Sequence, residues 1–256
     1  LPMKRLFFDI ETSPNIVTSW GIGRKITIDY RNILKERAVI CVCWKWEGSP
    51  KVYSSTWNDG DDKPLLEEFV NVLLNADEAI AHNGDRFDVK WLRTRCIKHG
   101  IKFPPQIKTL DTLKKARSLF YFNSNRLDYI GDFLGVGQKL ETSSGLWTRV
   151  CIDRCGKALK EMVKYCKEDV RLLERVYEKL DNYMTVNQHA AVLAGGEKWQ
   201  CPKCTSVNVK CSKTVITAAG TTKRQMQCNG CGKYFTISNR DYMHLLEFRQ
   251  EEKNKL

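Results

Sequence analysis

Short apolar runs alternate with longer amphipathic stretches over most of the chain. The runs that are typical of strands occupy residues 5–10, 38–46, 51–55, 78–81 and, more weakly, 107–110. Segments in which apolar residues recur at helical spacing begin at Asp61, Phe87, Asp111 and Arg126. Strands that come first and mixed helices that come after predict an α/β layered domain.

The longest amphipathic stretch predicts a helix over residues 157–183. One face of this helix stays apolar through Leu159, Met162, Val163, Cys166, Val170, Leu173, Val176, Tyr177 and Leu180. By contrast, residues 20–37 match no regular pattern, and we treat them as an insertion between the first two strands.

The pattern changes after about residue 183. Residues 184–198 are rich in alanine and glycine and predict a linker with a helical end. Beyond Trp199 the chain predicts short strands over residues 208–211, 223–227 and 234–236, then a helix over residues 241–256. We therefore divide the chain into an α/β domain (3–183), a linker (184–198), a small cysteine-marked module (199–238) and a C-terminal helix or tail (239–256).

The net charge of +12 on 256 residues suits a polyanionic partner, although solubility alone would also account for it. Residues 186–256 carry 11 basic and 5 acidic side chains, a charge of +6 on 71 residues. The rest of the chain has 31 basic and 25 acidic side chains, also +6, but on 185 residues. The C-terminal part is therefore more than twice as basic per residue.

No run of 18 apolar residues occurs, so we expect no membrane-spanning helix and no membrane partner. We see no export signal, and Leu1-Pro2 ahead of Met3 resembles a cloning remnant. The eleven cysteines favour a reducing compartment, the cytoplasm or the host cytoplasm if the protein is viral.

Four carboxylates and one phenol form the first candidate site. Asp9 and Glu11 are two apart in a predicted strand, so both side chains point to one face. Tyr165 and Asp169 are four apart in the predicted long helix and also share a face. Asp88 stands at a loop-to-helix junction. Several anionic oxygens gathered in one place are what two Mg²⁺ or Mn²⁺ ions need for phosphodiester hydrolysis.

Alternatives remain open at this point. A D-x-E triplet is common by chance in a chain with 30 acidic residues. Asp85, rather than Asp88, could be the inward-facing acid of its segment.

The order and spacing of these motifs resemble those of the DEDD 3′–5′ exonuclease superfamily, of tyrosine type. The three motifs read Asp9-Ile10-Glu11-Thr12, Asn83-Gly84-Asp85-Arg86-Phe87-Asp88 and Tyr165-x-x-x-Asp169, and the resemblance covers about residues 4–182. It implies an RNase-H-like fold, an α/β arrangement with a mixed five-stranded sheet flanked by helices. It also implies metal binding by Asp9, Glu11, Asp88 and Asp169, a water positioned by Tyr165, and a nucleotide pocket lined by Thr12, Asn83 and Phe87.

Two C-x-x-C pairs form the second candidate site. Cys201 with Cys204 and Cys228 with Cys231 could place four thiolates on one tetrahedral Zn²⁺, which predicts a structural zinc ribbon. A redox pair, an iron–sulfur cluster or rubredoxin-like iron are weaker alternatives. The remaining cysteines are expected to be core or incidental thiols.

Basic and aromatic residues of the ribbon are candidate nucleic-acid contacts: Lys210, Lys213, Lys223, Arg224, Lys233, Arg240, Tyr234 and Phe235. The alternatives are that the aromatics pack a miniature core while the lysines only solvate the surface, and that the ribbon docks a protein.

Taken together, the sequence predicts a metal-dependent 3′–5′ exonuclease that acts on a single-stranded 3′ end, with DNA favoured by the resemblance. The competing hypotheses are an RNA 3′–5′ exonuclease, an RNase-H-like endonuclease or resolvase, and a catalytically silent nucleic-acid-binding protein.

Overall fold

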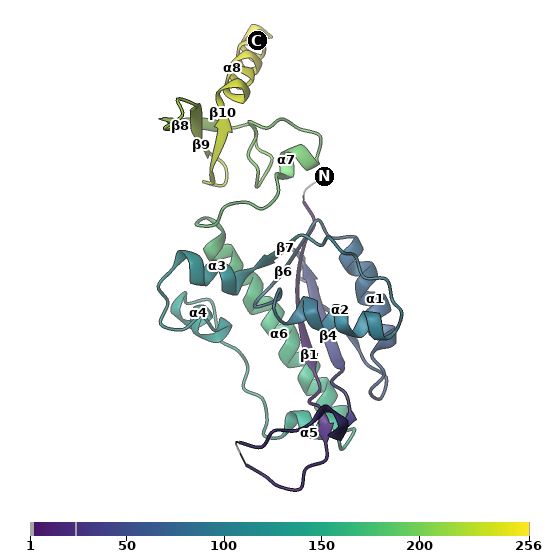
Figure 1. The fold of residues 1–256 in the computed structure, drawn as a ribbon. Helices are drawn as coiled ribbons and strands as arrows, with labels where there is room; N and C mark the ends of the chain where they lie inside the picture. Colours follow the sequence, from purple (N-terminus) through teal and green to yellow (C-terminus); the bar gives the residue numbers. More distant parts are fainter. Residues whose placement is uncertain (1–2, 24, 256) are drawn as a thin grey trace. The chain divides into compact units, whose positions relative to one another are not determined.

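A mixed β-sheet organises the N-terminal part of the computed structural model, which describes residues 3–23 and 25–255 (Figure 1). The suggested cloning remnant, Leu1-Pro2, lies outside the described residues. The chain separates into two units, Lys4–Tyr177 and Glu178–Leu256 with Leu1–Met3, each of which is described by itself. In the described part of the chain, no helix has the length and apolarity that crossing a bilayer requires.

The elements of the N-terminal unit are β1 (Arg5–Thr12), β2 (Ile16–Val17), a 3-10 helix (Tyr30–Asn32), β3 (Ile33–Lys35), β4 (Val39–Trp46), β5 (Tyr53–Thr56), α1 (Lys63–Leu74), β6 (Glu78–Ala81), α2 (Asp88–Lys98), β7 (Thr109–Asp111), α3 (Thr112–Leu119), α4 (Leu127–Phe133), α5 (Leu146–Cys151) and α6 (Gly156–Asp181), of which the last crosses into the second unit.

Five strands form the main sheet in the order β5-β4-β1-β6-β7. β1 pairs antiparallel with β4 and parallel with β6, and β7 is parallel to β6. This mixed five-stranded sheet with flanking helices confirms the fold class predicted from the sequence. The predicted insertion contributes the 3-10 helix and β3, which pairs with β2 in a separate two-stranded ribbon.

β1 alternates strictly between two helical layers. Phe7 packs edge-on against Tyr177 of α6, with ring centroids 5.3 Å apart. The next residue, Phe8, packs against Phe69 of α1 at 5.3 Å. Because side chains along a strand point alternately to its two faces, Asp9 and Glu11 lie with Phe7 on the α6 side. A buried Arg5 ties the start of this strand to Glu78 of β6, with Nε to Oε2 at 3.1 Å.

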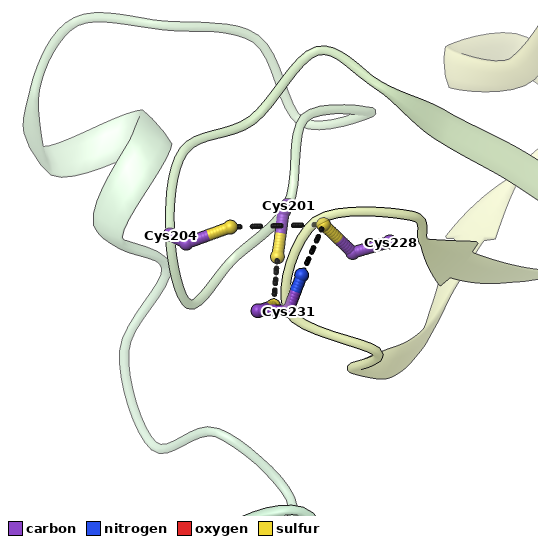
Figure 2. A group of neighbouring side chains, drawn as sticks. All are labelled: Cys201, Cys204, Cys228 and Cys231. Carbon is purple, nitrogen blue, oxygen red and sulfur yellow. Dashed lines mark hydrogen bonds between the residues drawn. The ribbon is translucent and has the colours of Figure 1, made fainter.

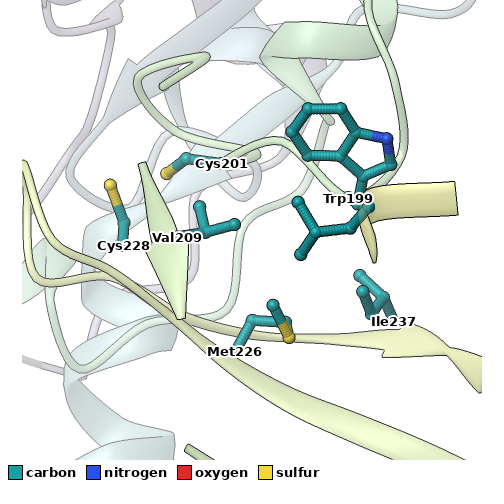
Figure 3. Packing of buried hydrophobic residues seen from close by; sticks show 7 residues of the cluster. Trp199, Cys201, Val209, Met226, Cys228 and Ile237 are labelled. Carbon is teal, nitrogen blue, oxygen red and sulfur yellow. The ribbon is translucent and has the colours of Figure 1, made fainter. Parts of the chain in front are cut away.

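The C-terminal unit contains α7 (Ala190–Leu193), β8 (Val209–Ile216), β9 (Thr222–Cys228), β10 (Tyr234–Ser238) and α8 (Asn239–Asn254). Its three strands form an antiparallel sheet in the order β10-β9-β8. A small core packs on one face of this sheet and includes Trp199, Val209, Met226, Ile237 and Leu245 (Figure 3). β8 runs on to Ile216, well past the predicted residue 211, because the hairpin partner β9 continues its ladder.

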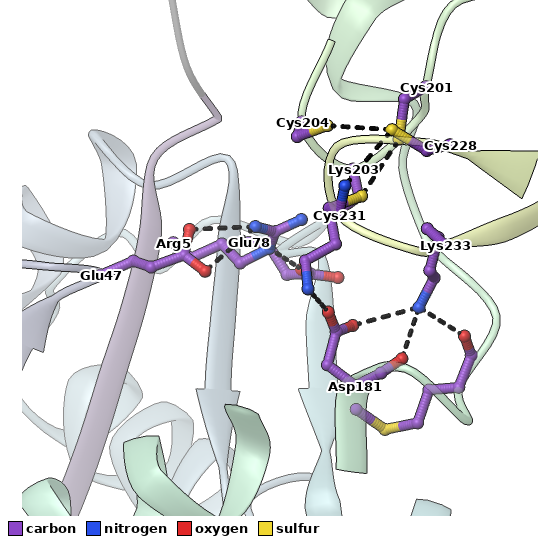
Figure 4. Close-up of polar contacts among 11 residues, drawn as sticks. Arg5, Glu47, Glu78, Asp181, Cys201, Lys203, Cys204, Cys228, Cys231 and Lys233 are labelled. Carbon is purple, nitrogen blue, oxygen red and sulfur yellow. Dashed lines mark hydrogen bonds and ion pairs between the residues drawn. The ribbon is translucent and has the colours of Figure 1, made fainter. Parts of the chain in front are cut away.

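Lys233 is a correction to the predicted nucleic-acid contacts. It is only 1% exposed, and its ammonium group donates hydrogen bonds to the main-chain oxygens of Asp181 and Met184 (Figure 4). Its Nζ also lies 3.3 Å from Asp181 Oδ1, and Lys203 pairs with the other oxygen of that carboxylate. A lysine buried among acceptors cannot reach a phosphate, so Lys233 is a structural residue of the ribbon.

Candidate active site and metal centre

The carboxylates of β1 face a cluster of thiols and the long helix. Asp9 pairs with Cys43 and Glu11 with Cys41 across the β1–β4 ladder, so the four side chains share one face. Cys166 of α6 donates from Sγ to the main-chain oxygen of Asp9 at 3.5 Å and to its Oδ2 at 3.6 Å. The thiols are buried, as expected for core cysteines, and they form one wall of the acidic site.

Helix α6 brings the second pair of predicted residues to the same place. Asp169 is 2% exposed, and carboxylate oxygens of Asp9, Glu11 and Asp169 all lie within 4.8 Å of one another. Tyr165, one helical turn before Asp169, is partly buried beside this cluster. Two acids of β1 and one acid of α6, far apart in sequence, therefore lie close together.

Asp88, the fourth acid, is held by the strand that carries the first two. It is 2% exposed, and its Oδ1 accepts a hydrogen bond from the Ile10 main-chain N–H at 3.2 Å. Asp85 instead accepts hydrogen bonds from Thr109 Oγ1 at 2.6 Å and Lys114 Nζ at 2.6 Å. Asp88 is therefore the inward-facing acid of this segment and Asp85 the outward-facing one.

The turn before Asp88 is set by a buried acid that the sequence did not single out. Asn83 has φ of +67°, in the left-handed region, and its N–H donates to Asp111 Oδ1 at 3.0 Å. Asp85 N–H donates to the other oxygen of Asp111 at 3.3 Å. A side chain at Gly84 would place its Cβ 2.5 Å from that of Ala81, so the turn requires glycine there.

Crowding of these acids raises their affinity for protons. Burial, followed by the charges of Asp88 and Glu11, raises the pKa of Asp9 well above its ordinary value. Burial, followed by the charge of Asp169, raises the pKa of Glu11 to about 8, and burial raises the pKa of Asp88 to about 7. Burial also raises the pKa of Asp169, although Lys139 lowers it. Without a cation, the site is partly protonated near neutral pH.

Lys139 is the residue of this site that sequence reasoning missed. Its ammonium group pairs with Asp169 Oδ2 and donates to the Tyr165 hydroxyl at 3.3 Å. The surrounding carboxylates raise the pKa of Lys139, against the effect of burial, so it stays charged. It lies in a loop between helices α4 and α5, where no periodic pattern marks it. Only its approach to Asp169 in space identifies it.

The donor set fits a pair of hard divalent cations. All the candidate ligands are carboxylate oxygens, the type that Mg²⁺ and Mn²⁺ prefer. Asp169 Oδ1 is buried and has no hydrogen-bond partner among the described residues. An orphaned anionic oxygen in a group of crowded acids is costly unless a cation balances it. Asp9, Glu11, Asp88 and Asp169 are the residues that would hold the ions.

We expect the affinity of this site for Mn²⁺ to rise with pH. Folding raises the pKa of Glu11 and Asp88 above their unfolded values of about 4, so their contribution to the stability of the metal-free fold is fully present below about pH 4 and is lost as pH rises through 7 and 8. A cation competes with these protons. Mn²⁺ titrations followed by calorimetry should therefore show about tenfold or more tighter binding at pH 8 than at pH 6.

The variant Glu11→Gln is the control for this pH dependence. It removes a carboxyl group whose pKa is raised to about 8, so its Mn²⁺ affinity should be weaker and should change less between the two pH values. An affinity in the unaltered protein that does not change with pH would contradict this assignment.

The residues predicted to line a nucleotide pocket lie in two places beside the acids. Thr12 ends β1, where its main-chain oxygen accepts from Trp147 Nε1 at 3.2 Å. Asn83 and Phe87 belong to the turn that leads into α2, and Phe87 N–H donates to the Asn83 oxygen at 3.0 Å. His82 is satisfied by Thr112 Oγ1 and the Asn125 oxygen, both at 2.9 Å, and is a structural residue.

A pocket of about 770 Å³ opens beside Tyr165 and Lys139. Its other walls come from α4 and the loop that follows it, and they include Arg126, Tyr129 and Gln138. Its size lies within the range of ligand-binding pockets in proteins.

The four cysteines of the two C-x-x-C pairs converge in the C-terminal unit (Figure 2). Cys201 Sγ lies 3.6 Å from Cys231 Sγ, and Cys204 Sγ lies 3.6 Å from Cys228 Sγ. Tetrahedral zinc with bonds of about 2.3 Å to sulfur would separate the sulfurs by about 3.8 Å, so the donor set fits this metal. Despite burial, the main-chain N–H groups of Cys231 and Gly230 lower the pKa of Cys228 to about 7, which favours the thiolate.

The other predicted nucleic-acid contacts separate into two groups. Lys210, Lys213, Lys223, Tyr234 and Arg240 are exposed. Arg224 is engaged internally, since it donates to Asn239 Oδ1 at 2.9 Å and stacks over the Tyr242 ring, and Phe235 packs against the small core.

The chain resembles known proteins both by a family model and by individual relatives. A family model described as the RNase H superfamily matches residues 34–181. The DNA polymerase of Thermococcus hydrothermalis is 32% identical over 103 residues, which are 40% of this chain and 6% of that protein. The DNA polymerase of Thermococcus litoralis is 22% identical in an alignment of 232 positions that covers 81% of this chain and 13% of that protein.

Among solved structures, the family B DNA polymerase of the hyperthermophilic archaeon Pyrobaculum calidifontis superimposes with a TM-score of 0.54 at 17% identity. The match covers 72% of this chain and 25% of that one. The chain thus spans only a small part of the polymerases it resembles. The family match, the mixed sheet and its arrangement of helices agree, and the chain belongs to the RNase H superfamily, with an RNase-H-like domain in its N-terminal unit.

Proposed function

We propose that this protein is a metal-dependent 3′–5′ exonuclease that hydrolyses phosphodiester bonds from the 3′ end of single-stranded DNA. The observation that carries the proposal is the convergence of Asp9, Glu11 and Asp169 within 4.8 Å, next to a phenol and an ammonium group. Hydrolases of phosphodiesters need anionic oxygens that hold cations and polar groups that orient water, and both are present here.

Two Mg²⁺ or Mn²⁺ ions held by Asp9, Glu11, Asp88 and Asp169 would lower the pKa of the attacking water and stabilise the leaving oxygen. The side chains of the protein would orient the attacking water and the phosphate. Burial raises the pKa of Tyr165 to about 12, so this side chain stays a neutral phenol that can hold a water by hydrogen bonding without acting as a strong base. The charged Lys139 beside it can stabilise negative charge that builds up on the phosphate.

The pocket beside Tyr165 supports a terminal nucleotide as the substrate end. Its walls combine an aromatic ring, Tyr129, with a cation, Arg126, and an amide, Gln138, and they also carry the carboxylates of Asp128, Asp132 and Glu141. Arg126 pairs with Asp128 and Gln138 donates to Asp132. The ring suits a base face, and the cation and the amide suit a phosphate and a base edge once a substrate replaces their carboxylate partners. A strand end fits such a recess better than the continuous backbone of a duplex.

The preference for DNA rests on the related proteins, which are DNA polymerases. An RNA 3′–5′ exonuclease would use the same site. A resolvase-like endonuclease on this fold is the second candidate, and the assay below separates all three.

The proposal is tested with 5′-labelled linear strands and internally labelled circular single strands of DNA and RNA, each incubated with Mg²⁺ or Mn²⁺. We expect a ladder that shortens from the 3′ end of linear DNA, while circles stay intact. A linear strand whose terminal 3′ linkage is blocked should persist. Cleavage of circles, or shortening from the 5′ end, would overturn the proposed polarity.

Replacing Lys139 with glutamine should lower the hydrolysis rate by about 10²-fold, because the substrate phosphate loses a positive charge held next to Tyr165. The affinity for Mn²⁺ should rise or stay constant, since one competing cation leaves the carboxylates. Steady-state kinetics and Mn²⁺ titration measure the two effects. Lys114→Gln is the matched control, because Lys114 also pairs with an aspartate, Asp85, outside the acidic cluster. Full activity in Lys139→Gln would contradict the role.

We also propose that Cys201, Cys204, Cys228 and Cys231 hold one structural Zn²⁺. The unit they belong to has a core of few residues, so metal binding would supply much of its folding free energy.

A further inference from the structure

The sheet of the zinc ribbon has two faces with opposite chemistry. Its inner face carries Val209, Met226, Cys228 and Ile237, all buried in the small core (Figure 3). The other face, which we call the outer face, consists of Lys210, Lys213 and Val215 of β8, Lys223, Gln225 and Gln227 of β9, and Tyr234, Thr236 and Ser238 of β10. None of these nine side chains is buried.

Strand register arranges the outer face in three rows, two of which run from a lysine of β8 to β10. The first row is Lys210, Gln227 and Tyr234. The second row is Lys213, Gln225 and Thr236. Paired residues in a ladder point to the same side, so each of these two rows places a cation, an amide and a β10 side chain next to one another.

A bulge in β8 places two lysines, Lys210 and Lys213, on this face. Lys210 pairs with Gln227 and Lys213 with Gln225, and the register shifts between Cys211 and Lys213. In a regular strand, residues three apart would point to opposite faces. The extra residue at the bulge turns Lys213 to the side of Lys210. The Cα atoms of Lys210 and Lys213 are therefore about 6.8 Å apart along the strand. At that spacing the two ammonium groups can meet different phosphates.

The charge of the ribbon is all of one sign. Residues 199–238 contain six Lys or Arg and no Asp or Glu, and Arg240 and Asp241 follow with one charge of each sign. Lys203 and Lys233 are used internally on Asp181, and Arg224 lies on the inner side with Asn239. Lys210, Lys213 and Lys223 form no ion pair with any residue that the structure describes, 3–23 and 25–255. Their positive potential on the outer face is uncompensated within the ribbon itself.

β10 adds an apolar groove next to these cations. The groove has a volume of about 650 Å³, and its walls include Val186, Val192, Pro202 and Phe235. Tyr234, which is 51% exposed, stands at its margin. An exposed aromatic ring beside an apolar recess is a surface on which flat bases can stack.

We propose that the outer face binds a single strand of nucleic acid, whose phosphates meet the three lysines and whose bases lie against Tyr234. The amides of Gln225 and Gln227 lie between the two groups, where they can hydrogen-bond to base edges. The choice of nucleic acid over another polyanion rests on the proposed nuclease function. A duplex should bind more weakly, because its bases are already stacked on one another.

The test is fluorescence anisotropy of labelled single strands of DNA and RNA with the zinc-loaded full chain. Asp169→Asn is present throughout and no Mg²⁺ is added, so binding is measured without hydrolysis. Lys210→Gln with Lys213→Gln should weaken binding about tenfold at moderate salt and reduce the log–log salt slope by about 1.4, because each lost phosphate contact on a single strand removes about 0.7.

The matched control removes two lysines from the end of α8, Lys253→Gln with Lys255→Gln, and should leave affinity within about twofold. Tyr234→Ser should also weaken binding by about tenfold, and Tyr234→Phe should restore it, since the ring and not the hydroxyl stacks. Equal losses in the two double lysine variants, or unchanged affinity in Tyr234→Ser, would overturn the proposal. Hydrolysis by the variants with Asp169 intact is assayed separately, so failure of the nuclease function would not be mistaken for failure of this surface.

Discussion

Asp169→Ala should abolish phosphodiester hydrolysis while the fold stays intact. The side chain contributes two oxygens to the acidic cluster, and one of them is buried with no hydrogen-bond partner among the described residues. Without it, the carboxylates have one anionic ligand fewer for divalent cations. We expect the rate to fall by about 10³-fold or more, equivalent to roughly 4 kcal/mol of transition-state stabilisation.

The thermal stability of Asp169→Ala should increase or stay unchanged. Burial raises the pKa of Asp169, which means that its charged form is disfavoured in the metal-free fold. Removing it relieves that cost, and Lys139, whose side chain is 29% exposed, can turn to solvent. Thermal unfolding in the absence of Mg²⁺ should therefore show an unchanged or higher midpoint.

The matched control is Glu168→Ala, one residue earlier on the same helix. Glu168 pairs with Arg171 and does not belong to the acidic cluster, so hydrolysis should continue at close to the normal rate. A normal rate in Asp169→Ala, or an equal loss in Glu168→Ala, would contradict the placement of the metal ions.

Cys201→Ser combined with Cys204→Ser should eliminate the bound zinc and unfold the ribbon. Two of the four sulfurs at the site disappear, and the remaining pair cannot enclose a tetrahedral ion. Structural zinc commonly contributes about 10–16 kcal/mol in small zinc modules, far more than a core of this size supplies. Metal analysis should fall from one zinc per chain to none, and limited proteolysis should remove the residues after 199.

Cys211→Ser is the control for this loss. Cys211 belongs to the same ribbon but lies outside the four-sulfur cluster, so its variant should keep one zinc and resist proteolysis. The N-terminal sheet should unfold at the same temperature in all variants. Retention of zinc by the double variant would reject these four ligands, and iron in place of zinc would favour the rubredoxin-like alternative.

Most of the architecture followed from periodicity. The long amphipathic pattern predicted a helix over residues 157–183, and α6 spans Gly156–Asp181. The predicted fold class is confirmed, because a strand buried on both sides and a helix with one apolar face leave few arrangements of layers. Boundaries were less accurate. The exposed second half of β8 carries no apolar alternation, and only its pairing with β9 makes it a strand.

In the candidate sites, too, local spacing predicted some features and tertiary contacts decided the others. Motif spacing placed Asp9 with Glu11 and Tyr165 with Asp169, because strand and helix periods are local properties. Spacing could not choose between Asp85 and Asp88, since that choice depends on whether Lys114 or the Ile10 N–H is within reach. Nor could it find Lys139, whose partner Asp169 is 30 residues away.

By itself, the sequence determined which residue types could do chemistry and which neighbours along the chain share a face. It also determined that the two cysteines of each C-x-x-C pair come together, because they need only one local turn to meet. The tertiary structure alone decided which acids crowd together, where Lys139 goes, and why Lys233 is buried rather than exposed. It also decided that Lys210 and Lys213 share a face, through a bulge that a regular strand would not contain. These outcomes depend on burial and on contacts between distant segments, and such interactions exist only after the chain has folded.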